Sequence, residues 1–213
     1  MKALLLLFTL PLAALESPLS LSDFQGNFLS VTNRFNGSVD FIHLKKLDRG
    51  GGLVWENSRN PLGVDLRASA VSVDPAGNLV IAALRGSGPK ALLSVLRYRM
   101  DGQLDWERDY DDGQRNVPTA AAIDREGNIY LGGNVLRGGR SIAKLWKLDP
   151  FGTVRWSREY GDVGNNYASQ LQLDIRGSIL LGVEVYYSQT AVSGQYTLVS
   201  VEYDPEGHQV SVR

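Results

Sequence analysis

The residues best suited to bind a ligand in this chain are basic side chains in loops, with a few polar and aromatic neighbours. Loops on a rigid scaffold commonly carry binding residues. We predict a ligand-binding surface where these loops gather. The alternative is an ordinary solvated loop face, because charge on loops is common. The candidate residues are Arg34, Arg85, Arg137, Arg140, Asn134, Glu184 and Tyr187.

Two of these candidates, Asn134 and Glu184, resemble Asn33 in their sequence context. Each follows a small-residue position in the second strand of a repeat, and Leu84 breaks the set. We predict that they line the mouth of a central channel, where a polar ligand or a cation would bind. The alternative is that strand ends are simply polar. Tyr187 stands beside the longest loop and is suited to stack on a sugar ring or a peptide, or else to pack in the core.

The sequence carries no recognisable catalytic or metal-binding pattern. The two histidines, His43 and His208, lack an accompanying carboxylate pattern, and no Gly-x-Ser-x-Gly motif occurs. There is no cysteine to assist a zinc site, which needs three or four convergent ligands. Each turn offers only one or two carboxylates, whereas calcium takes six or more oxygens. We therefore predict no catalytic residues, no metal and no cofactor.

Composition and the first residues bound the class of protein. A formal charge of −1 gives no reason to expect nucleic acid as a partner. The start, MKALLLLFTLPLAAL, has one basic residue and a short apolar run, which predicts a signal peptide over 1–14. A membrane anchor or a buried first strand is the alternative. No later run is apolar enough to span a bilayer, so we expect an exported protein without a stable membrane span after signal removal.

A repeat of about fifty residues organises the chain. Turn aspartates occur at Asp23, Asp74, Asp124 and Asp174, in the segments DFQGN, DPAGN, DREGN and DIRGS. Second turns are placed at Asp48, Asp101, Asp149 and Asp204, and tryptophans follow at Trp55, Trp106 and Trp156. Fixed-period similarity of this kind indicates a repeat architecture. We place one domain over 18–213, with units at about 18–60, 68–111, 118–161 and 167–213.

Each unit divides into four short strands separated by turn signals. In the third unit they are predicted near Thr119–Ile123, Ile129–Gly133, Ile142–Leu148 and Thr153–Tyr160. Four repeated four-stranded antiparallel sheets indicate an all-β protein, a β-propeller of four blades. The loops within blades (34–39, 85–90, 136–140 and 187–195) then share one face. The repeated tryptophan is expected to cover a contact between blades and to need a partner for its N–H.

These motifs also carry a resemblance. The order D-x-x-G-N, strand, loop, K-L-D-x-x-G and W-x-R-x-Y resembles the bacterial SBBP β-propeller repeat and, more distantly, quinoprotein (PQQ-type) propeller blades. The resemblance implies a propeller from a secreted or cell-surface protein, in a family mostly without an assigned activity. The first copy departs by its Gly50-Gly51-Gly52 expansion, and the fourth has Ser211 in place of the tryptophan.

Architecture and function each leave alternatives. We expect a closed four-bladed ring; an open arc, or two chains pairing into a larger ring as a homo-oligomer, are the alternatives. For function we expect an exported non-enzymatic binding module that takes a protein, peptide or glycan on its variable-loop face. The alternatives are a small propeller enzyme with chemistry at the mouth of the central channel, and a purely structural repeat module.

Overall fold

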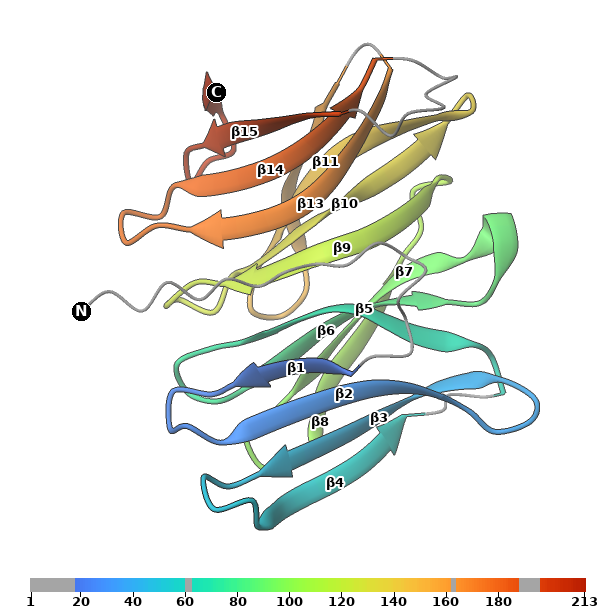
Figure 1. Ribbon diagram of the computed structural model, residues 1–213, viewed down its shortest axis with the longest axis vertical. Coiled ribbons are helices and arrows are strands. Elements are labelled where there is room, and N and C mark those ends of the chain that lie inside the picture. Colours follow the sequence, from blue (N-terminus) through green and yellow to red (C-terminus); the bar gives the residue numbers. More distant parts are fainter. Residues whose placement is uncertain (1–17, 60–62, 162–163, 188–195) are drawn as a thin grey trace.

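The computed structural model describes residues 18–59, 63–161, 164–187 and 196–213, which form four antiparallel sheets (Figure 1). The predicted signal peptide and residues 188–195 of the longest loop lie outside these ranges. The first sheet contains β1 (Leu19–Ser22), β2 (Phe28–Phe35), β3 (Asp40–Leu47) and β4 (Leu53–Arg59). The second contains β5 (Leu66–Val73), β6 (Leu79–Arg85), β7 (Leu92–Tyr98) and β8 (Leu104–Tyr110).

The second half of the chain repeats this layout. The third sheet contains β9 (Arg115–Ile123), β10 (Ile129–Arg137), β11 (Arg140–Leu148) and β12 (Val154–Tyr160). The fourth contains β13 (Asn165–Leu173), β14 (Ile179–Tyr186), β15 (Thr197–Tyr203) and β16 (Gln209–Val212). In every sheet the strands are hydrogen-bonded in chain order. The predicted four-bladed all-β propeller is therefore confirmed. In the described part, no helix is long and apolar enough to cross a membrane.

The aspartate turns join the first two strands of each blade by the expected chemistry. In the first blade, Oδ1 of Asp23 accepts hydrogen bonds from the N–H groups of Gln25 and Asn27 at 2.9 and 2.8 Å. Gly26 adopts the positive φ (80°) that the reversal requires. The second turns are equally regular, but in the second blade the turn begins at Arg99 and not at Asp101, because Gly102 N–H bonds to the Arg99 carbonyl.

The blades are held together by three hydrophobic cores, each shared by two successive sheets. One core joins the first and second sheets, a second joins the second and third, and the last joins the third and fourth. Small residues in the second strands of the blades permit this close approach. A side chain at Gly132 would place its Cβ 3.1 Å from Leu181 of the next blade. Burial of these apolar faces supplies the main driving force for the arrangement.

The ring is open, which corrects the expectation of a closed four-bladed ring. The first and fourth sheets lie at opposite ends of an arc (Figure 1). Among the described residues no hydrophobic core joins these two sheets. The first strands of successive blades contact one another along the arc, β1 with β5, β5 with β9 and β9 with β13. The outward faces of the two end sheets carry polar side chains such as Ser30, Thr32, Gln170 and Gln172 beside exposed apolar ones such as Phe28, Leu53 and Leu198.

The repeated tryptophans seal the junctions between blades, as predicted. The indole N–H of Trp55 donates to the carbonyl of Met100 at 3.0 Å, so the ring lies over the second turn of the next blade. Trp106 and Trp156 make the same bond to Pro150 and Pro205, at 3.0 and 3.2 Å. The turn glycines beneath have no room for a side chain. These residues therefore have a structural role.

Candidate functional site

The junction between the second and third blades differs from the other two on the variable-loop face. At the first junction, the Asp65 carboxylate accepts the N–H of Asp40 at 2.9 Å. At the third, the amide oxygen of Asn165 accepts the N–H of Ser141 at the same distance. The repeat places Arg115 at the corresponding position of the middle junction. Arginine has no acceptor atom in its side chain, so this link between blades cannot form there.

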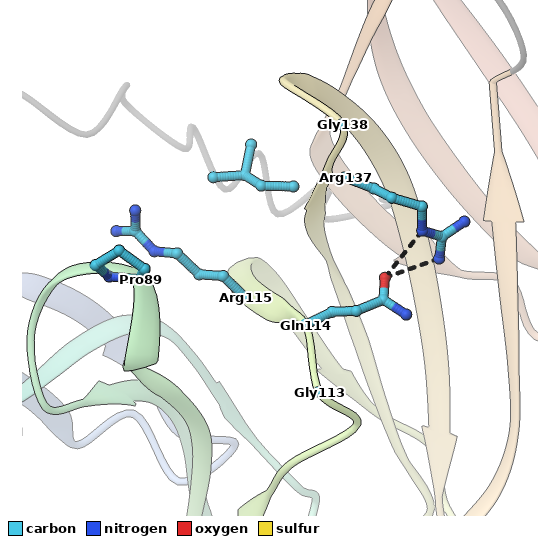
Figure 2. A pocket seen from close by; sticks show the side chains of 7 residues that line it. Pro89, Gly113, Gln114, Arg115, Arg137 and Gly138 are labelled. Atoms are coloured by element: carbon cyan, nitrogen blue, oxygen red, sulfur yellow. Dashed lines mark hydrogen bonds between the residues drawn. The ribbon is translucent and has the colours of Figure 1, made fainter.

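An open cavity of about 510 Å³ takes the place of that link. The amide of Ala91, which corresponds to the donors Asp40 and Ser141, bonds to Gly88 within its own loop, next to the short 3-10 turn η2 (Gly88–Lys90). The cavity therefore lies between the η2 loop of the second blade and the β10–β11 hairpin of the third. Its lining residues are Pro89, Gly113, Gln114, Arg115, Leu136, Arg137 and Gly138 (Figure 2).

The two arginines of this cavity differ in their partners. Arg137 donates to Gln114 at 2.7 Å and forms an ion pair with Glu159 at 2.9 Å. Arg115 points the opposite way, beside Pro89 (Figure 2). Its Nε is buried without a hydrogen bond, and no described residue forms an ion pair with its guanidinium. Because the lining contains no carboxylate, the Arg115 guanidinium is an uncompensated positive charge beside the apolar Pro89 and Leu136.

An ion pair between Asp112 and the buried Lys144 fixes the loop that precedes Arg115. The Asp112 carboxylate accepts a hydrogen bond from Lys144 at 2.8 Å and another from Asn116 at 2.7 Å. Burial alone would raise the pKa of Asp112, but these hydrogen bonds outweigh it and lower the pKa below its ordinary value. The loop at 111–114 is thereby anchored to the third sheet, which positions Gln114 and Arg115 at the cavity.

Two other predicted arginines hold neighbouring elements together. Arg85, at the end of β6, forms ion pairs with Glu107 and Asp109 of β8. Arg59 of the first sheet shares Glu107, so this network also links two blades. Arg140 donates to the carbonyl of Gly164 at 3.2 Å and so joins the third and fourth blades. The structure therefore gives both predicted binding residues, Arg85 and Arg140, structural contacts at blade junctions.

Asn134 and the related Asn33 also connect blades. Asn134 is buried, and its amide oxygen accepts the N–H of Ala168 in the next blade at 2.8 Å. Asn33 accepts the N–H of Ala68 at 2.8 Å in the same way. The middle junction has Leu84 facing Pro118, a residue without an N–H. This explains the irregular Leu84, because an amide oxygen at this position would find no N–H group from which to accept a hydrogen bond.

This pairing gives a testable double substitution. Asn134→Leu should lower the free energy of unfolding by about 2 kcal/mol, because the buried Ala168 N–H loses its acceptor. Adding Ala168→Pro removes that N–H and recreates the Leu84–Pro118 pair, so part of the loss should be recovered. Urea unfolding of both single variants and the double variant measures the coupling. Strictly additive losses would contradict this explanation of the junction.

The remaining predicted residues are spread over the arc and do not converge on one site. Arg34 is exposed on the outer face of the first sheet. Glu184 lies on the outer face of the fourth sheet and accepts a hydrogen bond from Tyr186 at 3.3 Å. Tyr187 lines a second open cavity, of about 470 Å³, with Tyr160 and Asn166. Of the predicted set, only Arg137 lies at the Arg115 cavity.

His43 has partners that the sequence did not reveal. Its Nδ1 lies 3.1 Å from the hydroxyl of Ser58, and its Nε2 lies 2.9 Å from Glu56 on the same strand. Serine, histidine and a carboxylate residue also form catalytic triads. The bonds here run across the face of the first sheet, and neither described cavity touches them. The Ser58 N–H donates to Asn57 and is not free to stabilise an oxyanion, so we interpret the cluster as a cross-strand contact.

The other histidine pairs within its own turn. The ring of His208 lies 2.9 Å from the Asp204 carboxylate. The sequence suggested that neither histidine has an accompanying carboxylate, and this prediction is wrong for both. Within the described ranges no group of three or more His, Asp or Glu side chains is arranged to hold a metal ion.

Comparison with known proteins supports the fold. No protein-family profile and no curated protein sequence matches the chain, so the SBBP resemblance stays a prediction. Solved β-propellers do match. The Hadza microbial sialidase Hz136 aligns with a TM-score of 0.60 at 16% identity, over 89% of this chain and 44% of that one.

Two further structures agree with this result. The endo-arabinase of Bacteroides thetaiotaomicron aligns with a TM-score of 0.52 at 14% identity, over 96% of this chain and 84% of the arabinase. A subtype N10 neuraminidase-like protein of A/little yellow-shouldered bat/Guatemala/060/2010 aligns with a TM-score of 0.54 at 12% identity, over 91% of this chain and 67% of the neuraminidase-like protein. The chain spans about half the length of the sialidase. At these identities the similarity establishes the propeller fold alone.

Proposed function

We propose that this protein is an exported, non-enzymatic propeller module that binds a carboxylate-bearing ligand on its variable-loop face. The cavity beside Arg115 is the binding site. The carboxylate belongs either to an acidic sugar of a glycan or to an acidic side chain of a peptide or protein. Pro89 and Leu136 contact the apolar part of the ligand, and Arg115 binds its charge.

The unpaired guanidinium of Arg115 carries this proposal. Arg85, Arg137 and Arg140 have carboxylate or carbonyl partners within the fold. Arg115 replaces a residue that links blades at both other junctions, and this replacement coincides with the open cavity. A carboxylate accepts two parallel hydrogen bonds from one guanidinium, which makes it the best-matched anion for a single arginine.

The test is a binding screen with Arg115→Ala. Purified protein is applied to an array of acidic and neutral glycans and, separately, to acidic and neutral peptides. We expect binding to the acidic members of one array and a loss of affinity of about 10- to 100-fold in Arg115→Ala, because a charge-assisted hydrogen bond is removed. The melting temperature should not fall, since Arg115 has no partner to lose.

Arg125→Ala is the matched control. Arg125 is exposed in an aspartate turn of the same blade, on the opposite face. The Arg125→Ala variant should therefore bind the acidic ligand with the affinity of the unsubstituted protein. Equal losses in both variants would contradict the cavity as the site. Turnover of a bound glycan that disappears in Ser58→Ala would instead support an enzyme and overturn the non-enzymatic assignment.

A further inference from the structure

In every blade after the first, the second turn accepts hydrogen bonds from side chains of the preceding blade. Its second residue, which is Met100, Pro150 or Pro205, accepts the indole N–H of a tryptophan. Its glycine carbonyl accepts a second donor. Asn57 donates to Gly102 at 3.0 Å, Tyr110 to Gly152 at 2.6 Å and Arg158 to Gly207 at 2.6 Å. The same two-point contact thus occurs three times.

The first blade has the same turn without an occupant. Asp48 N–H bonds to the Gly52 carbonyl at 2.8 Å, Gly51 N–H bonds to the Asp48 carbonyl at 3.0 Å, and Gly51 has a φ of 84°. The equivalent glycine Gly102 has a φ of 83° and lies against the ring of Trp55. At Gly51, by contrast, a Cβ would meet nothing within 4 Å. No described residue donates to the carbonyls of Arg49 or Gly51.

The surface around this turn is apolar and exposed. Phe28 is 41% exposed and Leu53 is 57% exposed, and Leu47 pairs with both across β2, β3 and β4. The corresponding residues of the second blade, Leu79 and Leu104, pack in the core beneath Trp55. The first blade therefore retains the apolar floor of a junction as well as its two carbonyl acceptors.

We propose that the turn Asp48–Gly52 and the adjoining Phe28 and Leu53 form a docking site for a tryptophan-bearing β-strand of another polypeptide. The indole would lie on Gly51 and donate to the Arg49 carbonyl. A donor side chain two residues later, as in Trp55–Asn57 and Trp156–Arg158, would bond to the Gly51 carbonyl. The partner is thus recognised by the pattern Trp-x-Asn or Trp-x-Arg on an extended strand.

A second copy of this chain does not supply that strand. Trp55, Trp106 and Trp156 are each bonded to a turn of their own chain, and Trp146 is buried. The fourth blade has Ser211 at the corresponding place, paired across the sheet with Glu202. The first blade therefore has an open acceptor turn, and none of the four tryptophans of this sequence is available as its donor. This asymmetry favours a different polypeptide and is independent of the Arg115 cavity.

The test uses a peptide taken from an occupied junction. The peptide TVRWSREY, which is residues 153–160, is titrated into isotope-labelled protein and followed by NMR. We expect the amides of Gly50, Gly51, Gly52 and Leu53 to shift, with half-saturation on the order of 1 mM, the range for one anchoring side chain. The matched peptide TVRASREY should leave these amides unshifted.

Two further measurements complete the test. Gly51→Val should abolish the response, because the added side chain occupies the place of the indole, while binding at the Arg115 cavity stays unchanged. Unliganded protein should have the mass of a monomer in sedimentation. Equal shifts with both peptides, no shift at the Gly50–Leu53 amides, or a dimer that Gly51→Val dissociates would each overturn the proposal.

Discussion

Replacing Lys46 by methionine is expected to lower the free energy of unfolding by about 3 kcal/mol at neutral pH. Nζ of Lys46 lies 2.9 Å from Oδ2 of Asp23, and both side chains are almost inaccessible, at 3% and 1% exposure. Removing the lysine leaves a buried carboxylate without its counterion. Urea unfolding of the two proteins at pH 7 measures the loss.

The pH dependence of this effect identifies its cause. Burial alone would raise the pKa of Asp23, but hydrogen bonds from Asn27 and Lys46 outweigh it and lower the pKa from 3.8 to about 2. A depressed pKa in the folded state contributes stability above pH 4, roughly 2 kcal/mol, which is lost as the pH falls toward 2. The difference in the free energy of unfolding between the Lys46→Met variant and the unsubstituted protein should therefore become smaller below pH 4.

Lys147→Met is the matched control for this experiment. Lys147 occupies the corresponding position of the third blade, where its ammonium donates to the Pro205 carbonyl at 3.0 Å and lies over the ring of Tyr130. Because no carboxylate is left unpaired there, the loss should be about 1 kcal/mol and nearly independent of pH between 4 and 7. Equal losses in the two variants would contradict the role of the buried ion pair.

Gly102→Ala should be the second strongly destabilising substitution, with a loss of about 3 kcal/mol. Part of this is backbone strain, since a side chain at a φ of 83° costs about 1 kcal/mol. The rest is steric, because the new Cβ would lie 2.7 Å from Cδ2 of Trp55. The indole would have to leave its place in the core and lose its bond to Met100.

Gly51→Ala separates these two contributions. Its φ is 84°, almost equal to that of Gly102, but nothing lies within 4 Å of the position that a Cβ would take. The strain alone should therefore remain, at about 1 kcal/mol. Urea unfolding monitored by tryptophan fluorescence compares the two variants. If both lose the same stability, the tryptophan contact adds nothing and the interpretation of the blade junction fails.

Much of the fold could be predicted because it depends on local residues repeated at a fixed spacing. Turn aspartates and glycines determine where each strand begins, and Trp55, Trp106 and Trp156 mark the junctions. The openness of the ring could not be predicted in this way. It depends on how far each sheet rotates against the next, which is set by packing among residues such as Gly132 and Leu181 from different copies.

The candidate site was harder to predict than the fold. Arg137, which was predicted on the loop face, lines the Arg115 cavity, but Arg137 is paired and Arg115 is not. A signal for Arg115 was present in the sequence, because Asp65 and Asn165 are the matching residues in the neighbouring copies. Its meaning required the structure, which shows that both of these residues accept an amide. The Ser58–His43–Glu56 contact likewise depends on the register of β3 and β4.

The separation of the interior into three pairwise cores has a consequence for how such a chain can change. In a closed propeller the sheets together complete a full circle, so the addition or removal of one sheet changes the angle between every pair of neighbouring sheets. In this arc each sheet depends only on the sheets beside it. A unit duplicated or deleted at either tip would disturb a single interface and leave the other members in place, so growth by whole units needs few compensating substitutions.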